Sequence, residues 1–171
     1  MYSGAASGYG WDDEDYDDED DDEAGVGSVS GGVNSDYESV SGDSFTAGDV
    51  TVLVPDGWGA YEDSLGRLFL VKGGSDSSDS FSCPSLAFEY HPNAAGSMDT
   101  GSSDDVVAYD LPLGDYEYQG TWRSSAGWYY GMFMANYEDG YILASLTVPE
   151  GEDCTPDDAD VQAAMASVEI N

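Results

Sequence analysis

Residues 116–150 read YEYQGTWRSSAGWYYGMFMANYEDGYILASLTVPE, and this stretch decides the fold. It contains three segments, 116–125, 126–138 and 140–150, that are rich in aromatic and β-branched residues. The sequences Ser-Ala-Gly and Glu-Asp-Gly separate them, and short runs of this kind form the tight turns of β-hairpins. We therefore predict three consecutive antiparallel strands that form a meander.

Three shorter segments upstream also have strand character. VTVLVP (50–55), GRLFLVKG (66–73) and PSLAFEYHP (84–92) carry apolar residues that suit a strand, and turn-forming residues follow each of them. We predict one strand in each. The segment VVAYDLPLG (106–114) fits either a short helix or a connector.

The C-terminal sequence TPDDADVQAAMASVEI (155–170) has the pattern of an amphipathic helix. Thr155 fits the N-cap and Pro156 the first helical position, and the acids that follow suit the helix dipole. Apolar residues recur at the helical spacing at Val161, Ala164, Met165 and Val168. We predict an α+β fold, a twisted antiparallel sheet of about six strands with this helix packed on one face.

The order of these segments resembles the PsbP-like family. VTVLVPDGW, TWRSSAGWYYGMFMA, YILASLTV and AAMASVEI are similar to that family's opening strand with Gly-Trp, its aromatic-rich hairpins and its closing helix. The resemblance spans about residues 44–171. It implies a domain of the kind that bacteria export or anchor to lipid, which acts as a non-catalytic interaction module.

Residues 1–43 have a different composition. Residues 12–23 include eleven carboxylates, and a Gly/Ser-rich run follows them. Such a segment has too little apolar surface to offset the entropy cost of ordering, and its like charges repel one another. We expect a disordered acidic arm over residues 1–43 and one domain over residues 44–171.

The charge of the chain excludes several classes of partner. The sequence has 36 Asp and Glu against 3 Lys and Arg, a formal net charge of −33. Nucleic acids and anionic bilayers attract proteins through Lys and Arg, so we predict that the protein binds neither. Self-repulsion of this size also predicts a monomer in dilute solution. The partner is then an unidentified protein or small ligand.

The composition favours an extracytoplasmic, cell-surface location. The two cysteines, Cys83 and Cys154, can form one disulfide outside the reducing cytosol, and the alternative is two unpaired buried thiols. The Met1 end lacks the pattern of a signal peptide, and no stretch reaches the length of a membrane span. We therefore expect an anchor that this sequence does not contain.

One motif points to catalysis. GDSFTAG (42–48) is similar to the nucleophile block of GDS-type ester hydrolases, with Ser44 as the nucleophile and His91, the sole histidine, as the base. Phe88, however, stands three residues before His91, where those hydrolases have Asp, and no buried strand is expected before Gly42. A chance match at the end of a linker explains the motif better, so we predict no catalytic residues and no enzyme activity.

Carboxylates are the metal ligands that this chain offers. One histidine and two distant cysteines cannot build a catalytic metal site. The run from Asp13 fails the EF-hand pattern, because Asp18 stands where the loop needs Gly and Ala24 where it needs Glu. We expect no cofactor and at most weak Ca²⁺ binding. The candidate metal ligands in the domain are Glu150, Glu152 and Asp153, for which surface solubility is the alternative role.

Aromatic side chains suggest a partner surface. Alternation along a strand turns only half of them inward. If Trp128 and Tyr130 face the core, Tyr129 and Phe133 form an outward apolar stripe, as at a partner or ligand surface. The alternative is that other elements cover both faces of the strand.

Three hypotheses for function follow. The leading one is a non-catalytic extracytoplasmic binding module on an acidic stalk. The second is a salt-adapted soluble protein, because charges at this density repel unless salt screens them. The third is a GDS-type ester hydrolase.

Overall fold

The computed structural model describes residues 33–74, 82–94 and 106–171, and its strands form two antiparallel sheets. A seven-stranded sheet has the order β3-β4-β5-β9-β8-β7-β6, and a three-stranded sheet has the order β1-β2-β10. The elements are η2 (Tyr37–Ser39), a 3-10 helix, β1 (Gly42–Ala47), β2 (Val50–Pro55), β3 (Trp58–Glu62), β4 (Leu68–Lys72), β5 (Ser85–His91), β6 (Val106–Leu113), β7 (Tyr116–Ser125), β8 (Trp128–Tyr137), β9 (Gly140–Pro149), α1 (Ala159–Ala166) and β10 (Glu169–Ile170). The α+β class predicted from the sequence is confirmed.

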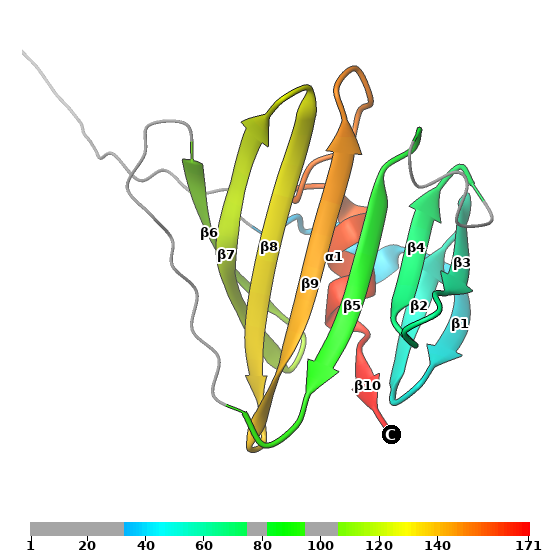
Figure 1. Ribbon diagram of the computed structural model, residues 1–171, viewed down its shortest axis with the longest axis vertical. Coiled ribbons are helices and arrows are strands. Elements are labelled where there is room, and N and C mark those ends of the chain that lie inside the picture. Colours follow the sequence, from blue (N-terminus) through cyan, green and yellow to red (C-terminus); the bar gives the residue numbers. More distant parts are fainter. Residues whose placement is uncertain (1–32, 75–81, 95–105) are drawn as a thin grey trace, which may run out of the picture.

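The seven-stranded sheet is centred on β9. The order of strands takes the chain from β5 to the far edge strand β6, after which it returns through β7 and β8 until β9 pairs with β5 (Figure 1). Strands β7, β8 and β9 form the predicted meander, in which Ser125 pairs with Trp128 and Tyr137 with Gly140. Two-residue loops therefore close both hairpins.

The first of these loops has the geometry that a twisted hairpin favours. Ala126 and Gly127 have φ angles of 54° and 84°. Two consecutive residues with positive φ are typical of a type I′ turn, whose twist matches the twist of the strands that it joins. Gly127 adopts this conformation without strain, whereas Ala126 carries a β-carbon in the left-handed region.

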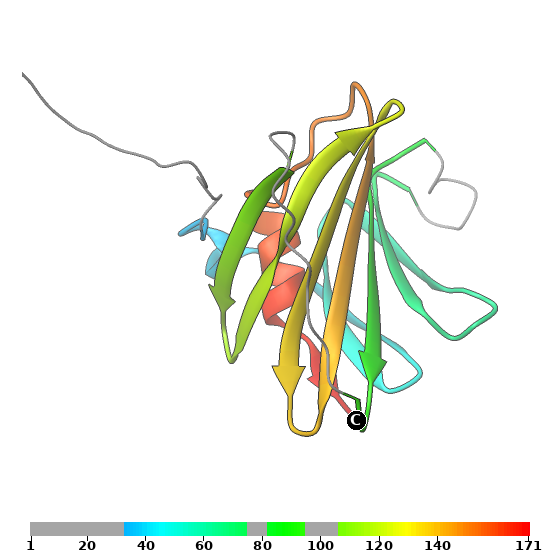
Figure 2. The same cartoon turned by 60° about the vertical axis from the view of Figure 1, so that its left-hand side comes forward.

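Helix α1 and the three-stranded sheet lie together on one side of the seven-stranded sheet (Figures 1 and 2). Their apolar side chains and those of the large sheet form a single buried core. Its members from the three-stranded sheet and the helix include Val50, Val52, Val161, Ala164 and Met165, and those from the large sheet include Leu70, Leu86, Phe88, Leu111, Tyr118, Phe133, Ile142 and Leu146. We call this side of the seven-stranded sheet the inner face.

Tyrosine hydroxyls connect the large sheet to the end of the helix. The hydroxyl of Tyr118 donates to the carbonyl oxygen of Met165 (2.8 Å), and that of Tyr116 donates to the carbonyl oxygen of Val168 (2.5 Å). The last carbonyls of a helix have no partner within the helix, and a buried carbonyl without a partner is costly. Tyr118 therefore stabilises the C-terminal end of α1 against the sheet, and Tyr116 stabilises the segment between α1 and β10.

The start of the helix differs from the prediction. Its N-cap is Asp158 and its first residue Ala159, whereas the sequence predicts Thr155 and Pro156. The hydroxyl of Thr155 instead accepts a hydrogen bond from the Asp157 N–H (3.1 Å), a local turn that competes with helix formation. All five residues from Val161 to Met165 are buried, since the helix lies between other elements.

The remaining differences concern strands. Residues 106–113 form β6 instead of a short helix or connector, and Trp58–Glu62 forms β3. The predicted strand at residues 50–55 (β2) pairs with β1 and β10 in a second sheet. The described residues therefore form ten strands in two sheets, where one sheet of about six strands is predicted. The structure also places η2 and the first two residues of β1 ahead of residue 44, where the domain is predicted to begin. The side-chain oxygen of the buried Gln162 accepts from the Asn34 N–H (2.6 Å), which joins the segment before η2 to α1.

Candidate functional site

The second side of the seven-stranded sheet, which we call the outward face, is covered by none of the described helices and strands (Figures 1 and 2). Because side chains alternate along a strand, the neighbours of the core residues in β4, β5, β7, β8 and β9 point to this side. The large side chains at these positions include Phe69, Glu89, His91, Glu117, Gln119, Arg123, Trp128, Tyr130, Met132, Met134, Tyr141 and Leu143, and Tyr61 of β3 pairs with Phe69.

Strand β8 has the opposite orientation from the one predicted. Phe133 is fully buried against the core, whereas Tyr130 and Met132 expose 41% and 47% of their surface. Tyr129 shares the side of Phe133, but near the end of the strand it is 36% exposed and its ring stacks on Trp122 at 5.6 Å. The predicted outward stripe of Tyr129 and Phe133 is therefore wrong, and Tyr130 and Met132 are the exposed large hydrophobic side chains of the outward face.

A continuous row of contacts crosses part of the outward face, from the edge strand β3 to β9. Arg67 lies over the Phe69 ring (5.4 Å), Glu89 is 4.0 Å from the Arg67 guanidinium, and a Glu89 oxygen is 3.2 Å from Nε2 of His91. Ring stacks end the row: Phe69 with Tyr61 at 5.1 Å and His91 with Tyr141 at 4.7 Å. These separations are close to the spacing between strands, about 4.8 Å, so the stacked rings stand upright and cover one another's faces. This row is a packed surface and offers few ring faces to a ligand.

A groove lies on the same face over strands β7, β8 and β9. Two rows of side chains line it: Thr121, Met132 and Ser145 form one, and Arg123, Tyr130 and Thr147 form the next. The backbone of Gly131 and Leu146 lies between the rows, and the volume of the groove is about 360 Å³. Since residues two apart on a strand are separated by about 6.6 Å, the groove has the width of a slender apolar group.

Arg123 differs from the two other cationic residues of the chain. Arg67 forms an ion pair with Asp63 (2.7 Å), and Nζ of Lys72 donates to the carbonyl oxygen of Asp153 (2.8 Å). No ion pair or hydrogen bond connects the Arg123 guanidinium to the rest of residues 33–74, 82–94 and 106–171. An arginine that is always charged thus lines a groove together with two threonines, a serine, a tyrosine and a methionine.

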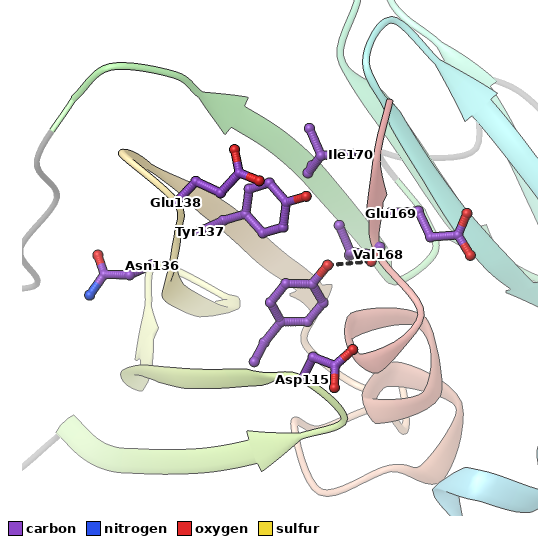
Figure 3. A pocket seen from close by; sticks show the side chains of 8 residues that line it. Asp115, Asn136, Tyr137, Glu138, Val168, Glu169 and Ile170 are labelled. Atoms are coloured by element: carbon purple, nitrogen blue, oxygen red, sulfur yellow. Dashed lines mark hydrogen bonds between the residues drawn. The ribbon is translucent and has the colours of Figure 1, made fainter.

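A larger cleft of about 580 Å³ lies where the start of β7 and the end of β8 meet β10 (Figure 3). Asp115, Glu138 and Glu169 contribute carboxylates to it, and Tyr116 and Tyr137 contribute rings. The three carboxylates lie around the rim and point in different directions in Figure 3. They do not converge on one point, as ligands of a cation would.

The predicted metal ligands are not brought together either. Glu150, Glu152 and Asp153 are all exposed in the loop after β9. Nowhere in the described ranges do three or more His, Cys, Asp or Glu side chains gather as a metal site would require. The acidic run at residues 12–23 lies outside the described residues.

The two cysteines are free thiols in the structure. Cys154 is buried, and burial together with the nearby Asp158 raises the pKa of its thiol to about 12. Lys72 adjoins both segments that carry the cysteines, because its N–H donates to Pro84 and its Nζ to Asp153. The predicted Cys83–Cys154 bridge is not formed here.

The residues of the hydrolase-like motif are apart. Ser44 lies exposed in β1 of the three-stranded sheet, and His91 ends β5 in the seven-stranded sheet. The histidine points to the outward face, where it contacts Glu89 and Tyr141. A serine nucleophile needs its base within hydrogen-bond reach, and the structure does not provide that pair.

Comparison with known proteins gives a fold likeness alone. No protein-family model and no curated protein matches this chain. A crystal structure from Bacteroides thetaiotaomicron VPI-5482, determined at 1.50 Å resolution, matches with a TM-score of 0.50 and 14% sequence identity. The match covers 76% of this chain and 48% of that one, so the chain spans about half the length of this structural neighbour.

The described residues include no helix that is both long and apolar enough to cross a membrane.

Proposed function

We propose that the protein is a non-catalytic extracytoplasmic binding module, and that it holds its ligand on the outward face of the seven-stranded sheet. The observation that supports this most is the difference in exposure along β8, where Phe133 is buried and Met132 is 47% exposed. Exposed apolar side chains that gather beside a groove are typical of ligand and partner surfaces. The resemblance to the PsbP-like family agrees with such a role.

The position of the arm is consistent with a stalk. Asn34 is hydrogen-bonded to Gln162 and to the carbonyl oxygen of Asp157, so the chain enters the domain beside α1 on the inner side of the large sheet. A stalk attached there leaves the outward face free to meet a ligand. The acids of residues 12–23, which lie outside the described residues, then belong to the proposed stalk.

A fragment screen tests the binding role. Neutral, cationic and anionic fragments are tested by ligand-observed NMR against the full chain and against Met132→Asp. We expect fragments that bind the wild type and are lost with Met132→Asp. Val107→Asp is the matched control, because Val107 is an exposed apolar residue of β6 outside the groove. Fragments that bind Met132→Asp as well as the wild type would contradict the proposed surface.

The absence of catalysis has its own test. Ester hydrolysis is measured with the full chain and with Ser44→Ala. We expect no turnover in either protein, since Ser44 and His91 belong to different sheets. Turnover that Ser44→Ala abolishes would replace the binding role by a hydrolase.

A salt-adapted protein is a second candidate, supported by the scarcity of ion pairs. The ion pairs that join described residues connect Asp63 and Glu89 to Arg67 and His91, and the sequence has 36 Asp and Glu against 3 Lys and Arg. The other carboxylates repel one another, and the Debye length falls from about 10 Å at 0.1 M salt to about 3 Å at 1 M. We expect the melting temperature to rise steeply with NaCl concentration if this candidate holds. A melting temperature independent of salt would remove it.

A further inference from the structure

The groove on the outward face has one property that selects among ligands: Arg123 is the only charged residue among the described residues that line it. The guanidinium of an arginine stays protonated in proteins. Its planar N–H donors match the two oxygens of a carboxylate in a bidentate arrangement. The hydroxyls of Thr121, Ser145 and Thr147 offer further donors along the two rows. We infer that the groove binds a small organic monoanion, with its carboxylate on Arg123 and a slender apolar body along Tyr130 and Met132.

The charge of the whole protein sets the upper limit on ligand charge. The formal net charge is −33, and each additional negative charge on a ligand adds repulsion from the surrounding carboxylates. Arg123 compensates one negative charge, because no second cationic residue lines the groove. A dianion or polyanion therefore gains less from Arg123 than it loses to the field of the protein.

The apolar part of the groove calls for an apolar body on the ligand. Met132 and Tyr130 lie in neighbouring rows, about 6.6 Å apart along the strand, and both have more than a third of their surface exposed. A methylene chain or the edge of one aromatic ring fills this width. The volume of about 360 Å³ lies at the lower end of the range of about 300–1,000 Å³ for small-molecule sites. A free small molecule fits these dimensions.

This inference rests on the proposed binding role and names the ligand class. Three related probes separate charge from shape: 3-phenylpropionate, its neutral amide 3-phenylpropionamide, and the dianion benzylmalonate. Each is titrated into the ¹⁵N-labelled full chain at about 0.15 M salt, where the Debye length is about 8 Å. We expect saturable shifts at the amides of Gly131 and Leu146 for the monoanion, and clearly weaker binding of the other two probes.

Variants then test the two parts of the groove. We expect Arg123→Gln to weaken the binding of 3-phenylpropionate about tenfold, since the variant loses the charge-assisted hydrogen bonds between the guanidinium and the carboxylate. Lys72→Gln is the control: it makes the same change in net charge, but Lys72 is bonded to Asp153 outside the groove. We expect the Lys72→Gln variant to bind 3-phenylpropionate with the affinity of the wild type. Met132→Ser should weaken the monoanion and the amide alike, because both probes carry the same apolar body.

The outcomes distinguish this inference from the proposed function. Equal binding of the amide and the monoanion, with shifts in the groove, would overturn the monoanion assignment and leave the binding surface intact. An Arg123→Gln variant with wild-type affinity would overturn it in the same way. A monoanion that shifts only residues of the acidic cleft, such as Asp115 and Glu169, would contradict the site itself.

Discussion

The two faces of strand β8 differ in how far their side chains are buried. Phe133 and Ala135 on the inner face are buried, and the rings of Tyr109 and Phe133 meet edge to face at 5.8 Å. Met132, one residue away, is 47% exposed and lies beside Arg123, for which the described residues provide no ionic partner. Packing in the core therefore explains the side chains on the inner face of β8. The exposed side chains on its outward face contribute little to the stability of the fold. The outward face is for this reason the place to look for function.

The largest expected effect is a loss of stability at high pH, and it arises from groups on the inner face. Burial raises the pKa values of Tyr109, Tyr118 and Cys154, all of which are core residues on the inner side. Each is neutral when protonated, so the unfolded chain loses its protons at a lower pH than the folded chain does. The unfolded state then binds fewer protons, and the free energy of unfolding falls as the pH rises above about 9.

Denaturant unfolding at pH 8, 9, 10 and 11 measures this loss. We expect a constant midpoint up to about pH 9 and a steep fall above it. The Tyr118→Phe variant should show a shallower fall, because one titrating group is gone. A midpoint that stays constant to pH 11 would contradict the burial of these groups.

A pair of truncations on β8 compares the faces directly. We expect Phe133→Ala to lower the free energy of unfolding by about 4 kcal/mol, because it leaves a cavity in the core. Met132→Ala, on the other side of the same strand, should change it by about 0.5 kcal/mol or less. Equal losses for the two variants, measured by denaturant unfolding, would show that both faces are packed.

A single hydroxyl tests the link between the inner face and the helix. Tyr118→Phe keeps the ring but removes the hydrogen bond to the carbonyl oxygen of Met165. That carbonyl then stays buried without the hydroxyl donor, and we expect a loss of about 1–3 kcal/mol. Tyr61→Phe is the control on the outward row, where a loss within about 0.5 kcal/mol is expected. Both variants remove a tyrosine hydroxyl, Tyr118→Phe on the inner face of the sheet and Tyr61→Phe on the outward face.

The smallest effect is expected at the β7–β8 turn. Ala126 has a φ of 54°, a conformation that costs a residue with a β-carbon about 1–2 kcal/mol. Asn tolerates this region better, and Asn-Gly is the preferred sequence of a type I′ turn. Ala126→Asn should therefore raise the free energy of unfolding by about 0.5–1 kcal/mol. A loss of stability would mean that the turn has another geometry.

Much of the fold is predictable from the sequence, because local signals agree with it. The hairpins of residues 116–150 carry both strand composition and turn residues, and the structure has them as β7, β8 and β9. Strand β6 is not recognised, since Pro112 lies near its end and proline is rare inside strands. The helix begins later than predicted because Thr155 forms a turn, which resembles an N-cap in sequence.

The sidedness of β8 is not predictable from the pattern alone. Residues 128–135 are apolar or glycine throughout, so alternation gives no sign of which set faces the core. The close approach at Gly120 and Gly131 decides it: a β-carbon at either position would meet the ring of Phe133, which lies over both glycines on the inner side. That contact depends on the pairing of β7 with β8. Arg123 did offer a signal, since it is one of only 3 Lys and Arg in the chain.

The exposure of the outward face is tested most directly through the methionine methyl groups. The chain has five methionines, of which Met132 lies on the outward face and Met165 in the core, 0% exposed. With ¹³C-methyl methionine and a soluble paramagnetic agent, we predict strong relaxation of the Met132 methyl signal and almost none for Met165. A Met132 signal as well protected as that of Met165 would show that the outward face is covered, and would contradict its assignment as the binding surface.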